Sequence, residues 1–264
     1  MTEPVDAAAR RLATAAETGV PCAPVRDLIG DHDQDRAYAV QAVLVDRRLA
    51  GGERIVGRKI GLTSRAVQAQ LGVGSPDFGT LFASMAYADR EPIPLSRFLQ
   101  PRVEAEVAFV LGHDLDQPEP TVADVIRATD HVLAAIEVVD SRIAEWDITI
   151  ADTIADNASN GAFVLGTAPR RLADIDLVGA GMVMEQRGDV VSTGAGVACL
   201  GSPVVAVVWL ARALGRLGRP LRAGDVVLSG ALGPVVPVTG PGAFRARISG
   251  LGELTAVFED GGRQ

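Results

Sequence analysis

Two glutamates spaced two positions apart are the first residues whose type and spacing point to chemistry. Glu104 and Glu106 lie in the apolar segment 101–111, whose flanks are typical of a β-strand. Alternate side chains of a strand point to one face, so the two carboxylates would repel each other. Burial would then cost several kcal/mol unless a positive charge, such as a divalent cation, lies between them. A half-exposed strand with its polar face in water explains the pair equally well, although Ala108 and Val110 continue this face and are apolar.

A third glutamate occupies the middle of a second apolar segment. Glu137 lies within 132–140, whose β-branched residues favour a strand over a helix. Three carboxylates from two strands, with coordination positions left open for water or substrate, suit Mg²⁺ or Mn²⁺. None of the three histidines has the spacing of a zinc site. We therefore predict a divalent-metal site formed by Glu104, Glu106 and Glu137.

Three further residues are candidates for chemistry around such a metal. Lys59 ends an apolar strand just before Gly61, where it would either pair with the acids or bind a substrate carboxylate. Asp77 lies in a turn-rich segment, in which an aspartate is more often a turn former than a catalytic acid. Ser159 belongs to the polar segment 152–161, interpreted as a loop that either satisfies its own backbone or presents polar groups to a ligand.

The elements that must position these residues begin with helices. A helix is predicted over 4–18, ended by Gly19, and a second over 34–50, which Asp33 can cap. A strand over 55–61 follows, and then a short helix over 65–71.

A β-rich body is predicted for the rest of the chain. Short apolar runs separated by glycine and proline predict strands over 101–111, 132–140, 161–166, 178–186, 226–230, 235–238, 244–249 and 252–258. Two helices interrupt them, one opened by the capping-box pair Thr121 and Asp124, the other by Ser202 and Pro203. This spacing predicts a sandwich or a rolled sheet.

Composition and charge exclude several classes of function. The 264 residues are 48% hydrophobic, enough for one large domain, or a small one fused to a larger one, without disulfides or structural zinc. The two cysteines, Cys22 and Cys199, are interpreted as buried free thiols in a reducing compartment. A net charge of −8 disfavours nucleic acid and anionic membranes, and no apolar run approaches the ~20 residues of a membrane span. We expect a cytoplasmic protein that acts on small molecules.

Several segments in order carry a resemblance to a known family. They are 23–30, 56–63, 70–73, 76–82, 99–106, 137–143, 155–159 and 230–234. Together they resemble the fumarylacetoacetase superfamily and, within it, the 2-keto-4-pentenoate hydratase (2-hydroxypentadienoate hydratase) family, nearly from end to end. One such motif would be weak, but this many in one order are highly specific.

The resemblance implies an α+β fold, with a mixed β-roll or sandwich of the fumarylacetoacetase C-terminal type and an N-terminal helical α/β region. We expect the division to fall between 1–70 and 71–264. The implied metal is Mg²⁺ or Mn²⁺, and the family's metal-binding glutamates correspond to Glu104, Glu106 and Glu137. Its active-site lysine, aspartate and serine correspond to Lys59, Asp77 and Ser159.

The implied activity is addition of water to 2-hydroxypenta-2,4-dienoate, in the breakdown of aromatic compounds. The segments at 76–82 and 230–234 favour this over 4-oxalocrotonate decarboxylation, which uses the same metal triad. An acylpyruvate hydrolase of the same superfamily and a non-catalytic partner subunit are two further candidates. The expected assembly is a homo-oligomer, with large rings known among the hydratases, and with a downstream aldolase or a decarboxylase as a candidate partner enzyme.

Overall fold

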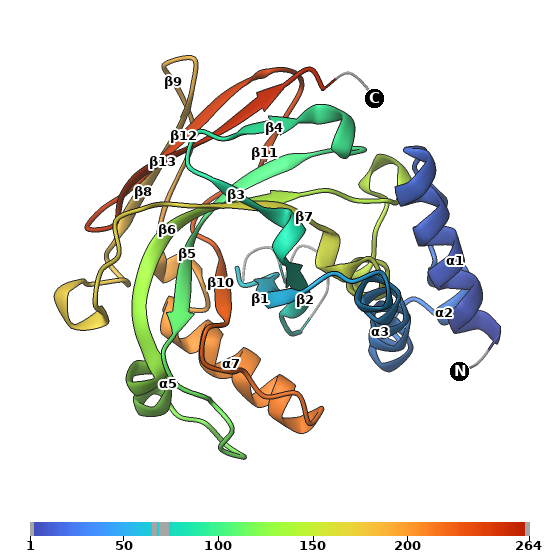
Figure 1. Cartoon of the computed structure of the whole chain (residues 1–264), viewed down its shortest axis with the longest axis horizontal. Coiled ribbons are helices and arrows are strands. Elements are labelled where there is room, and N and C mark those ends of the chain that lie inside the picture. Colours follow the sequence, from blue (N-terminus) through green and yellow to red (C-terminus); the bar gives the residue numbers. More distant parts are fainter. Residues whose placement is uncertain (1–2, 65–67, 69–73, 262–264) are drawn as a thin grey trace.

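The computed structural model describes residues 3–64, 68 and 74–261 of the chain. Apart from residue 68, the predicted helix over 65–71 lies outside the described residues, and so does the family motif at 70–73. The described part combines helices with two mixed β-sheets (Figure 1), so the predicted α+β class is confirmed.

Three helices form the N-terminal part: α1 (Glu3–Thr18), α2 (Arg26–Ile29) and α3 (Gln34–Ala50). α1 is followed by the left-handed Gly19, and α3 begins at Asp33, whose side chain accepts a hydrogen bond from Arg36 N at 3.0 Å. The two long helices therefore confirm the predicted ranges. Their buried faces pack around a further helix, α6 (Ile150–Ala155), and form a core cluster of their own.

The larger sheet carries the predicted site. Its eight strands are β1 (Ile55–Gly61), β2 (Asp77–Phe82), β3 (Ala86–Ala88), β5 (Arg102–Leu111), β6 (Thr129–Val139), β7 (Asn160–Leu165), β10 (Val226–Ala231) and β11 (Val236–Pro237). Their order is β2-β1-β10-β5-β6-β7-β3, and β11 pairs with β5. The long strands β5 and β6 run antiparallel and curve through the middle of the molecule (Figure 1). Strands far apart in sequence, such as β1 and β10, meet beside β5.

A second, five-stranded sheet lies on the side away from the N-terminal helices (Figure 1). Its strands are β4 (Pro92–Pro94), β8 (Gly181–Gln186), β9 (Asp189–Ala195), β12 (Gly242–Ile248) and β13 (Gly252–Glu259). Their order is β4-β13-β12-β8-β9. Apolar residues of both sheets, such as Val107, Ile136, Phe244 and Phe258, belong to one core cluster. The two sheets therefore pack face to face, as the sandwich-like prediction requires.

Two helices sit against the body of the sheet: α5 (Val122–Ala128) and α7 (Pro203–Arg216). The capping box of Thr121 and Asp124 and the proline at the start of α7 are both present as predicted. Among the described residues, one helical segment, Gly196–Arg216, is long and apolar enough to cross a membrane, which the count of apolar runs did not anticipate. Much of α7 is buried and belongs to the same core cluster as apolar residues of both sheets, as in a core helix.

Two segments differ from the sequence-based expectation. Residues 152–161, predicted as a polar loop, form the end of α6, a turn and the start of β7, and residues 152–160 are all buried. Their polarity suits burial because the side chains find internal partners: Asp152 accepts hydrogen bonds from Val25 N and Arg26 N at 2.8 and 2.9 Å. Asp77 begins strand β2 instead of forming a turn.

The two cysteines differ in burial. Cys199 is buried as predicted, whereas Cys22 is only partly buried, so the expectation of two buried thiols is wrong for Cys22. The division between 1–70 and 71–264 stays a prediction; β1 precedes it and pairs with β2 and β10 of the large sheet.

Candidate metal centre and active site

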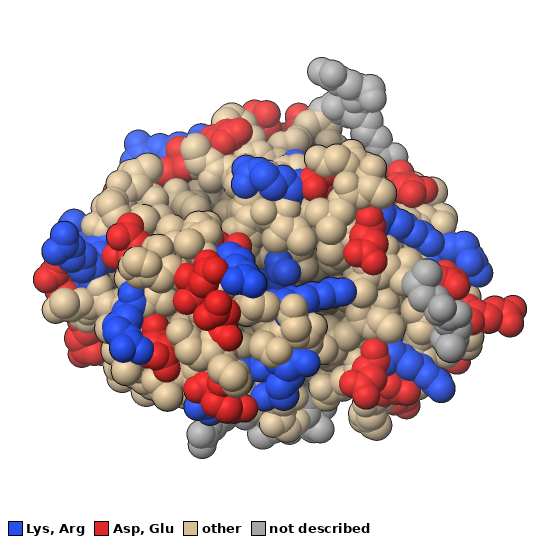
Figure 2. Space-filling view, turned by 60° about the horizontal axis from the view of Figure 1, so that its bottom comes forward, with Lys and Arg blue, Asp and Glu red and all other residues tan. Residues whose placement is uncertain are grey.

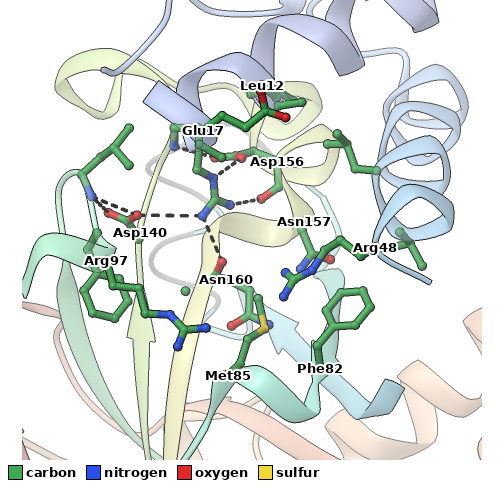
Figure 3. A pocket seen from close by; sticks show the side chains of 18 of the residues that line it. Leu12, Glu17, Arg48, Phe82, Met85, Arg97, Asp140, Asp156, Asn157 and Asn160 are labelled. Atoms are coloured by element: carbon green, nitrogen blue, oxygen red, sulfur yellow. Dashed lines mark hydrogen bonds and ion pairs between the residues drawn. The ribbon is translucent and has the colours of Figure 1, made fainter. Parts of the chain in front are cut away.

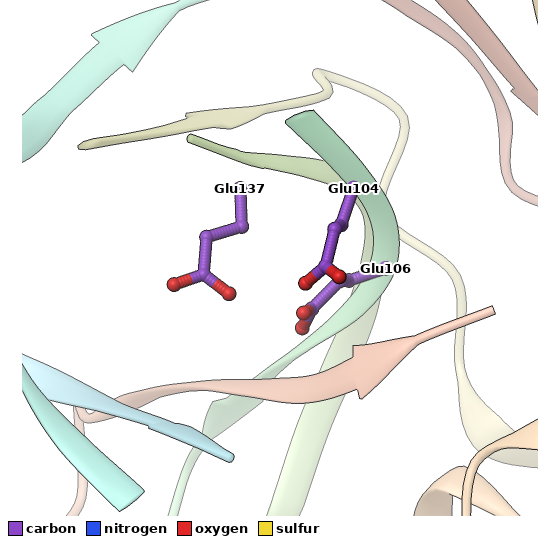
Figure 4. A group of neighbouring side chains, drawn as sticks. All are labelled: Glu104, Glu106 and Glu137. Carbon is purple, nitrogen blue, oxygen red and sulfur yellow. The ribbon is translucent and has the colours of Figure 1, made fainter. Parts of the chain in front are cut away.

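Glu104, Glu106 and Glu137 lie together on neighbouring strands (Figure 4). Glu104 and Glu106 are alternate residues of β5 and share a face, and Glu137 of β6 lies opposite Glu104 in the antiparallel register. Carboxylate oxygens of the three side chains lie within 4.8 Å of one another. The structure thus brings the three predicted ligands together, and the prediction of a solvated face is wrong for Glu106, which is fully buried.

The cluster lacks the partners that buried acids normally have. Glu106 and Glu137 have no exposed surface, and Glu104 is only partly exposed. Glu106 Oε2 accepts a hydrogen bond from Gly230 N at 2.8 Å, but Glu106 Oε1 and Glu137 Oε2 have no partner. Because unpaired buried carboxylate oxygens are costly, these atoms fit a cation. A donor set of three carboxylates, without nitrogen or sulfur, fits a hard ion such as Mg²⁺ or Mn²⁺.

Repulsion within the cluster increases its affinity for positive charge. Burial and then the charge of Glu137 raise the pKa of Glu104 to about 7. Burial, Glu137 and Glu104 raise the pKa of Glu106 well above its usual range. The three acids therefore bind protons more tightly than ordinary glutamates, and a divalent cation between them would favour the ionised forms instead.

Lys59 places one permanent positive charge beside the cluster. It comes from β1 and is almost fully buried; its Nζ lies 3.1 Å from Glu137 Oε1 and donates to Ala158 O at 2.8 Å. Burial would lower the pKa of Lys59, but Glu137 and then the other carboxylates of the site outweigh it, so the pKa is raised. Of the two roles predicted for Lys59, pairing with the acids is present in the structure. An ammonium has three donors, so a further contact to substrate is compatible with it.

Asp77 and Ser159 are joined through a third residue, Thr153. Thr153 Oγ1 of α6 donates to Asp77 Oδ2 at 3.3 Å and lies 3.3 Å from Ser159 Oγ. Since the threonine has one hydroxyl proton, the serine must donate to it in this arrangement. Burial raises the pKa of Asp77, and Lys59 only partly opposes this, so Asp77 keeps a proton to higher pH than an ordinary aspartate. The three side chains form a buried chain that can hold or move a proton.

A strained turn presents Ser159 and the carbonyl that binds Lys59. Asn157, Ala158 and Ser159 have φ of 55°, 53° and 52°, a conformation that costs about 1–3 kcal/mol per non-glycine residue. The Asn157 side chain holds the turn, because it accepts a hydrogen bond from Thr80 N at 2.7 Å and donates one to Thr80 O at 3.0 Å. The turn is therefore fixed against β2, the strand that carries Asp77.

Two glycines allow the close approaches that complete the site. A Cβ at Gly79 would lie 2.3 Å from Asn157 O, so only glycine lets β2 pass this close to the turn. Gly230 has φ +107°, and a Cβ there would lie 2.2 Å from Thr63 Oγ1. Glycine at this position lets the backbone N–H reach Glu106.

Thr153, Asn157 and Gly230 have no individual role predicted from the sequence. Their contacts join segments that are 76 to 124 positions apart in the chain. One local signal was available, since Thr149 and Asp152 have capping-box spacing and predict the start of α6. That helix would have placed Thr153 one turn before the N-A-S segment.

A second group of buried charges, which includes Asp140 and Asp156, lines the pocket drawn in Figure 3. Arg142 Nε contacts Asp156 Oδ1 at 2.5 Å, and Arg142 Nη1 donates to Asn160 O at 3.0 Å. Asp140 accepts hydrogen bonds from the backbone N–H groups of residues 99 and 100, at 3.0 and 2.6 Å. Asp140, Arg142 and Asp156 line a cavity of 370 Å³ that none of the three clustered glutamates lines. Here the protein itself supplies the partners of its buried charges.

The surface shows no preference for one sign of charge on the face drawn in Figure 2. Acidic and basic side chains are interspersed over the described residues of this face. A broad basic patch, the usual feature of nucleic-acid binding, is not among them.

The thirteen strands of the described residues, from β1 to β13, all fall within one family match. The model of the C-terminal domain of fumarylacetoacetate (FAA) hydrolase matches residues 55–259. The chain belongs to this family. The matched range also includes Lys59, Asp77 and the glutamate cluster.

Named relatives narrow the position within the family. The TodF product hydratase of Pseudomonas putida is 59% identical over 257 residues, which cover 97% of this chain and 96% of the relative. The 2-keto-4-pentenoate hydratase of Paraburkholderia xenovorans is 54% identical over 252 residues, covering 96% and 94%. The resemblance to 2-keto-4-pentenoate hydratases is therefore confirmed over nearly the whole chain.

A solved structure shares the complete fold. The 4-oxalocrotonate decarboxylase of Pseudomonas putida G7, complexed with magnesium and adipate, superposes with a TM-score of 0.93 and 35% identity, covering 98% of both chains. The N-terminal helices are thus part of the shared architecture, in addition to the family's β-body.

Proposed function

We propose that this chain is a divalent-metal-dependent hydro-lyase. It adds water to 2-hydroxypenta-2,4-dienoate, the enol form of 2-keto-4-pentenoate, and forms 4-hydroxy-2-ketopentanoate in aromatic-compound breakdown. The observation that carries the proposal is a cluster of three glutamates with unpaired buried oxygens beside a buried lysine. Identities of 59% and 54% to proteins named hydratases support water addition as the reaction.

Glu104, Glu106 and Glu137 would hold the cation, proposed to be Mg²⁺ or Mn²⁺. When bound, such an ion acts as a Lewis acid that polarises the keto oxygen of a 2-keto acid and stabilises negative charge developing there. Lys59 contributes a fixed positive charge next to Glu137 and stabilises negative charge on the substrate oxygen. Because its Nζ is anchored on Ala158 O, this charge is already in place before substrate arrives.

Proton movement is assigned to Asp77, Thr153 and Ser159. The enol gives up its hydroxyl proton, the terminal carbon gains a proton, and the elements of water then add to the adjoining pair of carbons. Asp77, with its raised pKa, is suited to deliver a proton to carbon, and Ser159 to orient the attacking water. The hydroxyl of Thr153 links these two groups, because it contacts both Asp77 and Ser159.

Decarboxylation of a 2-keto dicarboxylic acid is the second candidate. It is favoured by the similarity in structure to 4-oxalocrotonate decarboxylase. An acylpyruvate hydrolase would need a histidine paired with a glutamate to activate water, and no histidine belongs to the acidic cluster of the described residues. A non-catalytic partner subunit would not need the unpaired carboxylates or Lys59.

The proposal is tested by assaying both reactions on the purified protein with Mg²⁺ or Mn²⁺. Loss of the dienoate absorbance is followed together with the product by NMR, and carbon dioxide release is measured on 4-oxalocrotonate. We expect water addition to dominate. Carbon dioxide release without water addition would support the decarboxylase, and metal binding without either reaction would support the partner subunit.

Assembly and location are proposed on the sequence resemblance. We infer a cytoplasmic homo-oligomer, with a large ring and a complex with a downstream aldolase or a decarboxylase as the specific forms to examine. Light scattering on the protein alone, and on a mixture with the enzyme that consumes its product, would test both.

A further inference from the structure

Arg102 is a cation without a protein acceptor on the face that carries the glutamates. It lies two positions before Glu104 in β5, so its side chain shares the face of Glu104 and Glu106. Among the described residues, no carboxylate or carbonyl forms an ion pair or hydrogen bond with its guanidinium. The guanidinium instead lies over the ring of Trp146, 4.2 Å from its centroid.

The position of Trp146 is fixed by Gln100. Trp146 Nε1 donates to Gln100 O at 3.2 Å, and Gln100 Oε1 accepts a hydrogen bond from Glu145 N at 2.8 Å. Gln100 Nε2 donates to Ser141 O and Ile143 O at 3.0 and 2.8 Å. Glu145 and Trp146 both adopt positive φ, 60° and 56°, which is unfavourable for such residues. The loop thus accepts strain while it holds the indole under Arg102.

The exposure of the site and the charge of Arg102 indicate that an anion could bind beside this side chain. Glu106 and Glu137 are fully buried, whereas Glu104 and Arg102 are partly exposed, so the cluster is more accessible on the Arg102 side.

The net charge of the site also favours a contact between Arg102 and an anion. Three ionised glutamates are balanced by Lys59 together with one divalent cation, so an anionic substrate adds a negative charge that nothing offsets. Lys59 already contacts Glu137 and Ala158. Arg102 has five N–H donors, none of them used within the described part of the chain.

We propose that the guanidinium of Arg102, supported by Trp146, binds the carboxylate of the 2-keto-enoate substrate. The inference rests on the proposed function, since it assigns a recognition residue to that same site. A guanidinium presents two parallel N–H groups to a carboxylate and fixes its orientation, which a single ammonium does not. Arg102 takes no part in proton transfer, so it acts on substrate affinity more than on turnover.

Steady-state kinetics of two Arg102 variants test the inference. Arg102→Met should raise the KM for the dienoate about 10- to 100-fold, the range for loss of a charge-assisted hydrogen bond, with little change in kcat. Arg102→Lys should lie between this variant and the wild type. Arg97→Met is the matched control, because Arg97 also lies over an aromatic ring, Tyr87 at 5.6 Å, but is not on the strand that carries Glu104 and Glu106. Its KM should equal that of the wild type.

A binding measurement without turnover separates this inference from the proposed function. The chain has two tryptophans, so Trp209→Phe leaves Trp146 as the fluorescent reporter. In this background pyruvate and its uncharged analogue pyruvamide are titrated in the presence of Mg²⁺. Pyruvate should bind tighter than pyruvamide, and Arg102→Met should remove most of that difference.

The outcomes are distinct. Equal weakening of both ligands, or an unchanged KM in both Arg102 variants, would overturn the inference while leaving the hydratase proposal intact. Pyruvate binding that depends on Arg102, in a protein that adds no water to the dienoate, would overturn the function and retain the inference. If Arg102→Met does not fold, Arg102→Lys carries the test, and wild-type behaviour in both assays would overturn the inference.

Discussion

Two groups of buried carboxylates lie near the strained turn at 157–159, and they differ in the source of their partners. Around Arg142, Asp140 and Asp156 accept hydrogen bonds from backbone N–H groups and from the guanidinium. Around Glu106, two carboxylate oxygens have no partner, and three further acids compete for one lysine. The first group is complete as the protein folds, whereas the second is complete only when something positive binds.

The difference shows which feature of a buried acid indicates a ligand-binding site. Burial alone does not, since both groups are buried and burial raises the pKa of Asp156 to about 6 just as it raises that of Glu104 to about 7. Unpaired oxygens facing a common point do distinguish them. Mutations should therefore affect stability in the paired group and activity in the unpaired group.

The largest effect is expected from Glu106, the acid with the most unfavourable surroundings. Glu106→Gln keeps the shape of the side chain and an oxygen to accept the bond from Gly230 N, but removes the charge. Metal-dependent water addition should fall by about 10,000-fold or more, because Lewis-acid stabilisation worth several kcal/mol is lost. The melting temperature in EDTA should stay the same or rise, because charge repulsion is relieved. Full activity in this variant would contradict the metal assignment.

The paired group should respond in the opposite way. Arg142→Met leaves Asp156 and Asp140 buried without their cation, and the free energy of unfolding should fall by about 3–5 kcal/mol in urea denaturation. Arg127→Met is the control, since Arg127 pairs with Asp124 at the surface, where loss of an ion pair should change the free energy of unfolding little. Equal losses in the two variants would remove the distinction between paired and exposed charges.

Adding a divalent cation should stabilise the folded protein through the unpaired group alone. At 100 times its dissociation constant, Mg²⁺ or Mn²⁺ should add about 2.7 kcal/mol and raise the melting temperature by about 5–10 °C. The shift should vanish in Glu106→Gln and persist in Arg142→Met. A shift that survives in Glu106→Gln would place the cation elsewhere.

The smallest effect concerns the hydroxyl between Asp77 and Ser159. Thr153→Val keeps the volume but removes both contacts, and kcat should fall about tenfold, which is the effect of one hydrogen bond. Thr153→Ser should restore most of it, and the pH profile of kcat should shift only in the valine variant. Equal losses in the serine and valine variants would indicate a packing role for the missing methyl group instead.

The local features of the site could be predicted from the sequence. Apolar flanks and alternation placed Glu104 and Glu106 on one strand face, and cap residues such as Asp33 and Thr121 located helix starts. These inferences depend on neighbours a few residues away. Family resemblance then supplied Lys59, Asp77 and Ser159, which local patterns alone left undecided.

Long-range features were not predictable in this way. The register that sets Glu137 opposite Glu104, and the contact between Asp77 and Thr153, depend on how distant segments pair. Polarity was misleading for 152–160, because polar residues usually predict solvent exposure. In this segment their partners, such as the backbone of Val25 for Asp152, come from elsewhere in the chain.

The close passage of β2 by the turn also limits how this sequence can diverge. Even a methyl group at position 79 would collide with Asn157 O, 2.3 Å away. A substitution there would therefore displace either β2, which carries Asp77, or the turn whose Ala158 O accepts the hydrogen bond from Lys59. The side chain of Asn157 forms hydrogen bonds with the main chain of residue 80 and not with its side chain. The identity of residue 80 is therefore less restricted. In a saturation library, position 79 should therefore be nearly invariant beside a more tolerant neighbour. Substitution at position 79 is therefore limited by steric contact with the backbone, independently of any effect on catalysis.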